Sequence, residues 1–437
     1  MVQTPFIRIE VYRLTLQNTL SHIVTFAPNK DTNFISYSFS KNINNMSGEF
    51  SFTIKPKDID FYSIENLDIV KIYEGDELVF IGVVTKTTQN SSLQGDTVVI
   101  TGKEICYLFE LLFYSFDISI MCYLNEKQRQ DASNISLKLN LNEIPNESLK
   151  SKLMSLYNSF KDLVNNSKQQ RTFITNLIET VFNKNNFLEV DEKVKFEYPI
   201  SSNLFNNSDT NYISFIKNLL PSPIYEIYGM VGNEQPYIKI RQVPFEKETW
   251  NELAKRNIVI DENYLESFSF SKSCEEVYSV FYSYIENSLI SDENTQKATA
   301  ISTNPYAVVN QEKMNRYGCK PMKVFFVGYG KDNSQINSSE EKESIDNKIT
   351  DQLGEFLKKQ NKKLEEWFYN IDEMLIGTFS LVNNWKKSPS VGDVVKFRDK
   401  EFYVTSVEHS WSYGQKGKVN LKVDRGGIYH NGVFVKA

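Results

Sequence analysis

Histidine side chains could bind a metal or act as a catalytic base, but the chain holds only His22, His409 and His430. No HExxH motif and no Cys/His cluster with metal-ligand spacing includes them. His409 lies in a predicted strand from Val404 to Trp411, where we expect a solvated position. The sequence therefore predicts no metal site.

Cysteine could supply a nucleophile or a disulfide framework. Cys106, Cys122, Cys274 and Cys319 are scattered and form no CxxC pair. Such spacing in a long chain does not resemble a disulfide scaffold. We expect buried free thiols.

The stretch Gly328-Tyr329-Gly330-Lys331 resembles part of a phosphate-binding loop. The Walker pattern needs a glycine five positions before Gly330 and a Ser or Thr after the lysine, but Phe325 and Asp332 stand there. No GxSxG elbow is present either. We therefore predict no catalytic residue and no cofactor-binding residue, and we expect a protein that is not an enzyme.

Paired carboxylates remain open, because two acids that are close in space suffice for glycoside hydrolysis. The chain has 55 Asp and Glu residues, most of which we expect to be solvated. An embedded hydrolase therefore stays as an alternative.

The composition is that of a globular protein with a β-rich interior. At 437 residues the chain is long enough for about three domains. Aromatic residues make up 13%, and such side chains suit pleated, half-buried surfaces. The net charge of -6 argues against general nucleic-acid recognition.

Two segments bear on membranes and export. Residues Ile105 to Leu124 approach the length of a membrane span, but Glu110 and Asp117 would each cost about 3 kcal/mol at the bilayer centre. We expect a buried helix or strand pair there, and no stable membrane insertion. Alternation from Ile7 to Val11 indicates a strand instead of a signal peptide, so we expect synthesis in the bacterial cytoplasm.

A three-strand meander organises the chain and occurs twice. The C-terminal copy runs from Ser390 to Arg425, with period-2 alternation between turns rich in Gly, Asp and Lys. The N-terminal copy runs from Leu67 to Lys103. The two copies align Asp68 with Asp393, Glu77 with Glu401, Phe80 with Val404 and Val83 with Val407.

Each meander has an upstream partner hairpin. The stretch from Tyr37 to Lys41 is echoed from Phe268 to Lys272, and at the same offset Phe50 falls on Phe281 and Ile54 on Ile285. We therefore expect a returning hairpin from Tyr264 to Ile285. The pattern predicts one small antiparallel β-barrel used twice, with the second copy split by an insertion.

The remaining elements complete an α+β, β-rich fold with mixed helical and β insertions. We expect helices over 149–163, 173–182 and 213–220, a hairpin from Ile224 to Val243, an exposed loop over 287–304, a strand over 323–327, a long helix over 345–367, and a tail from His430 that projects toward a partner. The expected domains are 1–105 (first tube-like barrel), 106–260 (mixed insertion), 261–286 (first hairpin of the second barrel), 287–375 (loop, strand and long helix) and 376–437 (rest of the second barrel and tail).

Short motifs in this order resemble a known family. They are Leu67-Asp68-Ile69-Val70 with Gly82-Val83-Val84, Ile100 to Glu104, Ile238 to Phe245, Met314 to Gly318, and Pro389 to Val395. Together with the split second barrel, they resemble the baseplate (tail) hub proteins of contractile-tailed phages, phage-tail-like bacteriocins and related contractile injection systems. Each motif is short, whereas the likeness covers nearly the whole chain.

The resemblance implies a structural protein of a virion or tail-like particle. It implies a homotrimer whose six barrels adapt a sixfold tail tube to a threefold central spike. The implied partners are the chain itself, the tail tube protein, the central spike protein, other baseplate proteins and the tape measure protein. Two alternatives stay open, namely a tail-associated cell-wall hydrolase and a glycan-binding tail-tip module.

Overall fold

A computed structural model gives the fold and describes part of the chain: residues 6–14, 20–28, 33–43, 45–55, 63–93, 95–107, 188–190, 214, 217, 220–232, 235–286, 307–327, 339–385 and 388–435. The chain divides into two compact units. Unit 1 comprises Met1–Leu108, Glu226–Glu275 and Asn370–Ala437, and unit 2 comprises Phe109–Tyr225 and Glu276–Tyr369. Unit 1 is therefore assembled from three separate pieces of the chain.

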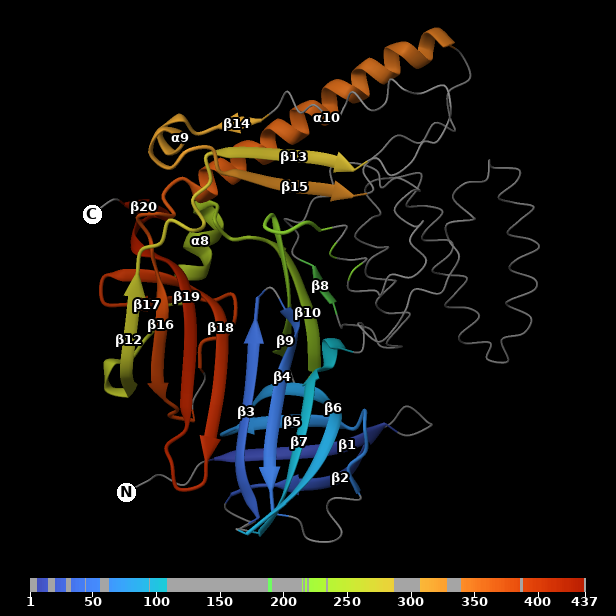
Figure 1. Cartoon of the computed structure of the whole chain (residues 1–437), viewed down its shortest axis with the longest axis vertical. Helices are drawn as coiled ribbons and strands as arrows, with labels where there is room; N and C mark the ends of the chain where they lie inside the picture. The colour runs from blue at the N-terminus through green and yellow to red at the C-terminus, as the bar shows by residue number, and fades with distance from the viewer. Residues whose placement is uncertain are drawn as a thin grey trace, which may run out of the picture. The chain divides into compact units, whose positions relative to one another are not determined.

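Unit 1 is built on one large sheet whose strands run in the order β12-β16-β19-β18-β3-β4-β7-β6-β5-β1-β2 (Figure 1). The strands of its N-terminal part are β1 (Ile7–Leu14), β2 (Leu20–Phe26), β3 (Phe34–Asn42), β4 (Asn45–Ile54), β5 (Ile69–Glu74), β6 (Glu77–Ser92) and β7 (Gly95–Glu104). Those of its C-terminal part are β11 (Ile258–Val259), β12 (Leu265–Ser271), β16 (Leu375–Val382), β17 (Val394–Phe397), β18 (Lys400–Ser412), β19 (Lys418–His430) and β20 (Val433–Val435). The expected β-rich antiparallel fold is confirmed.

Five strands recur in the same spatial order, which confirms the predicted repeat. The N-terminal repeat is β3-β4-β7-β6-β5, and the C-terminal repeat is β12-β16-β19-β18-β17. Both meanders form as the alternation predicted. The match of Tyr37 to Lys41 with Phe268 to Lys272 is also confirmed, since Phe39 faces Phe50 on β4 as Phe270 faces Gly377 on β16.

The hairpin expected from Tyr264 to Ile285 does not form. Strand β12 pairs with β16, while β13 (Val280–Glu286) lies in unit 2 and pairs in parallel with β15 (Pro321–Val327). The counterpart of Phe50 is therefore Gly377, not Phe281. Period-2 alternation is the same in both candidate strands, so sequence proximity favoured the wrong partner.

The expected alignment within the meander is also shifted. In both repeats the aspartate at the start of the meander accepts a backbone hydrogen bond from a valine: Val84 N donates to Asp68 O, and Val404 N donates to Asp393 O, each at 2.9 Å. Val404 therefore corresponds to Val84, not to Phe80. The hairpin of β5 and β6 is longer than that of β17 and β18, and this extension displaces the match.

Each repeat encloses its own apolar core on one side of the sheet. The N-terminal core includes Phe26, Phe52, Ile72 and Phe80, with β1, β2 and β5 folded over β3, β4 and β7. The C-terminal core includes Trp250, Phe379, Phe402 and Leu421, where α8 (Lys247–Ala254) supplies the tryptophan. A turn of 3-10 helix, η4 (Glu262–Tyr264), precedes β12, and η1 (Ile105–Tyr107) follows β7.

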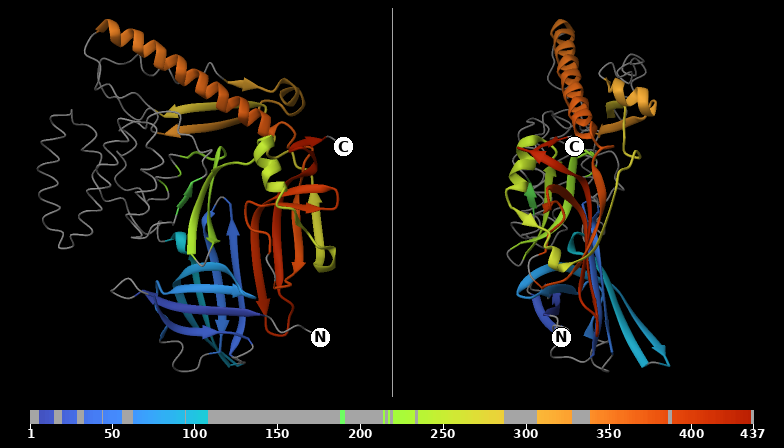
Figure 2. Two further views of the ribbon diagram at one scale, coloured as in Figure 1. Left: turned by 180° about the vertical axis from the view of Figure 1, so that it is seen from behind. Right: turned by 90° about the vertical axis from the view of Figure 1, so that its left-hand side faces the viewer.

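Unit 1 also contains the predicted hairpin between residues 224 and 243, formed by β9 (Tyr225–Gly232) and β10 (Gln235–Gln242). The expected projecting tail is wrong, because β20 folds back and pairs with β19, with Phe434 opposite Tyr429. The turn at Asn431 and Gly432, both with positive φ, allows this reversal. Figure 2 shows the repeats from two further directions.

Unit 2 is a smaller α+β body. Strand β13 lies between β14 (Val308–Val309) and β15. The long helix α10 (Ser339–Phe368) buries Phe356, Leu357 and Leu364, and α9 (Gln311–Tyr317) begins at Asn310, whose side chain caps it. The predicted strand near 323–327 and the predicted long helix are thus confirmed. Strand β8 (Leu188–Val190) also belongs to this unit.

Several expectations lie outside the described residues. These are the segment after Tyr107 up to Leu124, the helices over 149–163 and 173–182 and most of that over 213–220, the loop over 287–304, and the stretch Gly328 to Lys331.

Candidate assembly interface

The two repeats join edge to edge through β3 and β18. Strand β18 is long: Lys400 to Tyr403 pair with β17, and Ser406 to Ser412 pair with β3 along the same edge. Seven residue pairs run from Asn42 opposite Ser406 to Ser36 opposite Ser412. Figure 1 shows β18 and β3 side by side in the middle of the sheet. We call this contact the internal joint.

A buried polar network ties the internal joint to the end of β5. The Glu74 carboxylate accepts hydrogen bonds from the Tyr37 hydroxyl and from Asn383 Nδ2, the latter at 2.8 Å. His409 Nδ1 lies 2.9 Å from Glu74 Oε1. All four side chains are buried. Because an unpaired buried charge is costly, these contacts fix the position of the joint.

Two opposing effects set the pKa of the Glu74 carboxyl. Burial by itself raises this pKa, but His409, Tyr37 and Asn383 together bring it below its ordinary value of 4.5. Burial and the neighbouring carboxylate raise the pKa of the Tyr37 phenol well above its usual range. Glu74 is thus held as an acceptor and Tyr37 as a donor at neutral pH.

His409 is buried, so its expected solvated position is wrong. The cause is a β-bulge between Val404 and Ser406, which inserts Thr405 as an extra residue. The bulge reverses the alternation, so that Val404 and Val407 both face the core and His409 follows Val407 inward. Without the bulge, period-2 counting from the buried Val404 places His409 on the solvent-facing side of the strand.

Aromatic rings pack around this network. Phe39 stacks on the His409 ring with 4.5 Å between centroids, and Phe34 stacks on Trp411 at 5.6 Å. Tyr37 and Trp411 are directly opposed across the joint and are 2% and 4% exposed. Such ring pairs add about 1 kcal/mol each to the area they bury.

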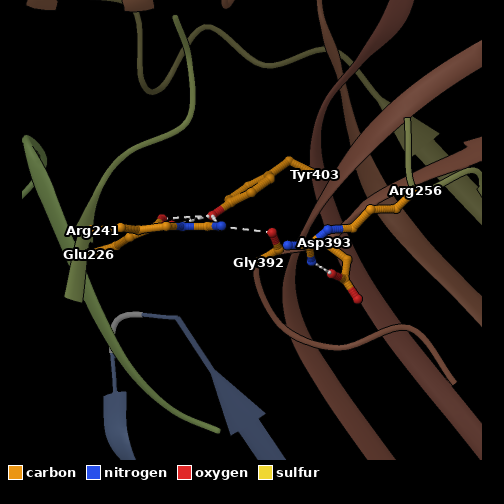
Figure 3. A network of polar contacts seen from close by, with 6 residues as sticks. All are labelled: Glu226, Arg241, Arg256, Gly392, Asp393 and Tyr403. Carbon is orange, nitrogen blue, oxygen red and sulfur yellow. Dashed lines mark hydrogen bonds and ion pairs between the residues drawn. The ribbon is translucent and has the colours of Figure 1, made fainter. Parts of the chain in front are cut away.

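A second buried network fastens the β9–β10 hairpin to the C-terminal meander (Figure 3). Arg241 forms an ion pair with Glu226 and donates to Gly392 O and Tyr403 Oη, each at 2.8 Å. The Tyr403 hydroxyl donates to Glu226 Oε2 at 2.7 Å. Burial raises the pKa of the Glu226 carboxyl, opposed by Arg241. Every polar group has a partner, as a buried network requires.

Each meander begins with the same aspartate corner. Asp68 Oδ2 accepts from Glu65 N at 2.8 Å, and Asp393 Oδ2 accepts from Ser390 N at 2.9 Å. The preceding residue has positive φ in both, at Leu67 and Gly392. Arg13 binds both oxygens of Asp68, whereas Arg256 contacts one oxygen of Asp393 at 3.2 Å.

The same two edges recur without a neighbour. Strand β12, the counterpart of β3, pairs only with β16, and it forms one margin of the sheet among the described residues. Strand β6, the counterpart of β18, pairs with β5 as far as Val83. From Lys86 to Ser91, its only neighbouring strand among the described residues is β7. We call these stretches the β12 edge and the β6 edge.

The described residues offer little for catalysis or ligand binding. No group of three or more His, Cys, Asp or Glu among them is placed to hold a metal ion. A cavity of about 440 Å³ in unit 1 has Lys41 and His409 in its wall, but Lys41 already pairs with Glu104 and His409 with Glu74. Within the described part of the chain, no helix has the length and apolar character of a membrane span.

The expectation of buried thiols is confirmed for Cys106 only. Cys274 and Cys319 are exposed, because each lies in a connection that follows a regular element, β12 and α9 respectively. Sequence reasoning also missed Glu74, Tyr37, Arg241 and Glu226. The available signal was a charged residue at the end of an apolar strand, and this is too common to be specific.

Comparison with protein-family models finds no match, and comparison with curated proteins finds none. Comparison with solved structures finds tail proteins at low sequence identity. The 43 kDa tail protein of prophage MuSo2 from Shewanella oneidensis is 10% identical, with 96% of this chain and 98% of that chain covered and a TM-score of 0.49. A tail protein from Neisseria meningitidis is 8% identical, with 97% and 98% covered and a TM-score of 0.47.

The prophage tail protein gp18 from Listeria monocytogenes is 11% identical, with 95% of this chain and 94% of that chain covered and a TM-score of 0.43. These structures are named as tail proteins, the class that the sequence motifs also resemble.

Proposed function

We propose that this protein is a non-enzymatic structural hub of a phage tail or tail-like particle. One observation carries the proposal: two equivalent repeats join edge to edge inside the chain, and at the β12 edge and the β6 edge the same two edges recur with no further strand among the described residues. A contact that joins one repeat to the next within a chain can also join the last repeat of one copy to the first repeat of the next copy.

Such a contact is head-to-tail, since β12 and β6 are different surfaces. Head-to-tail contacts give a closed ring when the rotation between neighbours closes on itself. Three copies would supply six repeats, which matches a sixfold tube on one side and a threefold spike on the other. The resemblance of the sequence motifs to baseplate hub proteins supports this number.

The partners in this proposal are further copies of the chain, the tail tube protein, the central spike protein, other baseplate proteins and the tape measure protein. The protein would act at the baseplate of the particle. Two strand edges that no other described strand covers supply the physical reason for self-association, because an exposed strand edge pairs readily with another strand.

Native mass across a concentration series tests the proposal. The monomer has a mass of 50.7 kDa. We expect a species of about three times that mass, formed alone or on addition of a spike protein, and six-lobed rings in electron micrographs. A strict monomer at high concentration with both tube and spike proteins present would overturn the hub assignment.

A glycan-binding role has one specific observation in its favour. On β13 and β15 of unit 2, Tyr282, Tyr284 and Phe325 form a run of stacked rings, with 5.4 Å between Tyr284 and Phe325, and Phe325 is half exposed. Flat aromatic faces can bind sugar rings. A glycan array compares the wild type with Phe325→Ala, and equal signals for the two would remove this second candidate.

A further inference from the structure

We propose that the β12 edge of one copy pairs antiparallel with the β6 edge of the next copy in one defined register, with Ser269 opposite Asn90. The inference rests on the proposed function, because it specifies how the copies of a hub contact one another. The internal joint supplies the template, in which Ser38 lies opposite Ser410. The two strands of the template have counterparts that can be matched residue by residue.

Strand β12 reproduces β3. Ser38 faces Ser51 on β4, and Ser269 faces Thr378 on β16. Both strands also carry an irregularity near their start, between Phe34 and Ser36 in β3 and between Leu265 and Ser267 in β12. Phe39, Ser38 and Tyr37 therefore correspond to Phe270, Ser269 and Phe268.

Strand β6 reproduces β18 in the same detail. A bulge falls between Val84 and Lys86 in β6 and between Val404 and Ser406 in β18. The extra residue is a threonine in both, and its hydroxyl donates to a carbonyl on the next strand: Thr85 to Thr101 O at 3.3 Å and Thr405 to Lys422 O at 3.2 Å.

Combining the two matches transfers the register. The template pairs Phe39 with His409, Ser38 with Ser410 and Tyr37 with Trp411. Counting on from the bulges, His409, Ser410 and Trp411 correspond to Gln89, Asn90 and Ser91. The junction between copies therefore sets Phe270 against Gln89, Ser269 against Asn90, and Phe268 against Ser91.

Both edges have the character of strands that need a neighbour. Phe268 is 43% exposed, whereas its counterpart Tyr37 is 2% exposed because β18 covers it. From Ser267 to Ser271 and from Thr87 to Ser91 neither edge carries a charge or a proline. Charges and prolines are the usual devices that keep an edge strand from pairing, so these two stretches lack that protection, and the charged residues Lys86 and Glu266 lie only at the start of the two edges.

Disulfide cross-linking tests the register. Residues directly opposite on antiparallel strands have Cα atoms about 5 Å apart, a separation that a disulfide can bridge, whereas a shift of two residues moves them to more than about 7 Å. The background carries Cys122→Ser, Cys274→Ser and Cys319→Ser, so that buried Cys106 is the only native thiol left. Chains with Ser269→Cys and chains with Asn90→Cys are each oxidised separately. A mixture of the two variants is oxidised in parallel.

We expect a covalent dimer from the mixture and monomers from either variant alone. The double variant should give linear and closed covalent trimers on non-reducing gels. The matched control is Ser38→Cys with Ser410→Cys, whose disulfide forms within one chain and leaves the mass unchanged. The shifted pair, Ser267→Cys with Asn90→Cys, should give less than about a tenth of the product.

The outcomes separate the register from the hub. In one outcome, native mass shows a three-copy species and the control disulfide forms, but Ser269→Cys and Asn90→Cys do not cross-link. This outcome would overturn the register and leave the ring in place. Cross-linking of Ser269→Cys with itself would indicate a twofold contact between two β12 edges and would also overturn it. A monomer under all conditions would overturn both proposals.

Discussion

The internal joint and the open edges share one backbone arrangement but carry different side chains. At the joint, Tyr37 and Phe39 of β3 meet Trp411 and His409 of β18 in a dry, aromatic contact. At the open edges, Phe268 and Phe270 are retained on β12, whereas the facing positions on β6 are the small polar residues Ser91 and Gln89. The internal contact lies within one chain, and the proposed contact between copies would depend mainly on backbone hydrogen bonds.

The polar network sharpens this difference. Glu74 lies at the end of the longer β5–β6 hairpin, which reaches the internal joint, and the shorter β17–β18 hairpin ends at Phe397 and Lys400 without an equivalent carboxylate. A buried, hydrogen-bonded carboxylate therefore lies at the internal joint, and the described residues of the β17–β18 turn place no counterpart of Glu74. A junction that must assemble from free copies avoids the desolvation cost of such a charge.

The largest expected effect separates the joint from the β6 edge. Trp411→Ala should lower the free energy of unfolding by about 4 kcal/mol, because it leaves a cavity against Phe34 and Tyr37. Ser91→Ala, at the corresponding exposed position, should change it by less than about 0.5 kcal/mol. Denaturant melts followed by circular dichroism at low protein concentration measure both. Equal losses would contradict the correspondence of these two positions.

Acid should weaken the joint through Glu74. Its folded-state pKa is below the ordinary value of 4.5, so its contribution is fully present above pH 4.5 and is lost as the pH falls through the lowered pKa. Glu74→Gln should cost about 3 kcal/mol at pH 7 and flatten the decline in melting temperature below pH 4.5. Glu77→Gln, exposed in the same hairpin, is the control. If the melting temperature of Glu74→Gln falls as steeply below pH 4.5 as that of the wild type, this carboxylate is not the source of the decline.

The smallest expected effect compares the two aspartate corners. Arg13 binds the buried Asp68 through two hydrogen bonds of 2.8 and 2.9 Å, so Arg13→Ala should cost about 1.5 kcal/mol. Arg256 makes a single contact of 3.2 Å from a half-exposed side chain, and Arg256→Ala should cost less than about 0.5 kcal/mol. Melting temperatures at low and high salt measure both, and a larger loss for Arg256→Ala would reverse the expected order.

Sequence reasoning was reliable where structure is local. Alternation between turns predicted both meanders, and the likeness of the stretches that begin at Tyr37 and Phe268 predicted the repeat. It failed where one extra residue changes the outcome. The bulge at Thr405 turned His409 inward, and the longer first hairpin shifted the match of Val404 from Phe80 to Val84. Neither feature alters local composition enough to be detected.

The sequence by itself determined which segments become strands, because side-chain period and turn residues act over a few positions. Only the tertiary structure decided which strands meet. In the sequence, the segment Glu276–Tyr369 of unit 2 separates β12 from its partner β16, and most of the chain separates β3 from its partner β18. Strands of equal alternation offer many partners of similar energy, and the choice depends on core packing around Phe52, Phe80, Phe379 and Phe402. The open β12 and β6 edges follow from that choice, and so does the proposed ring.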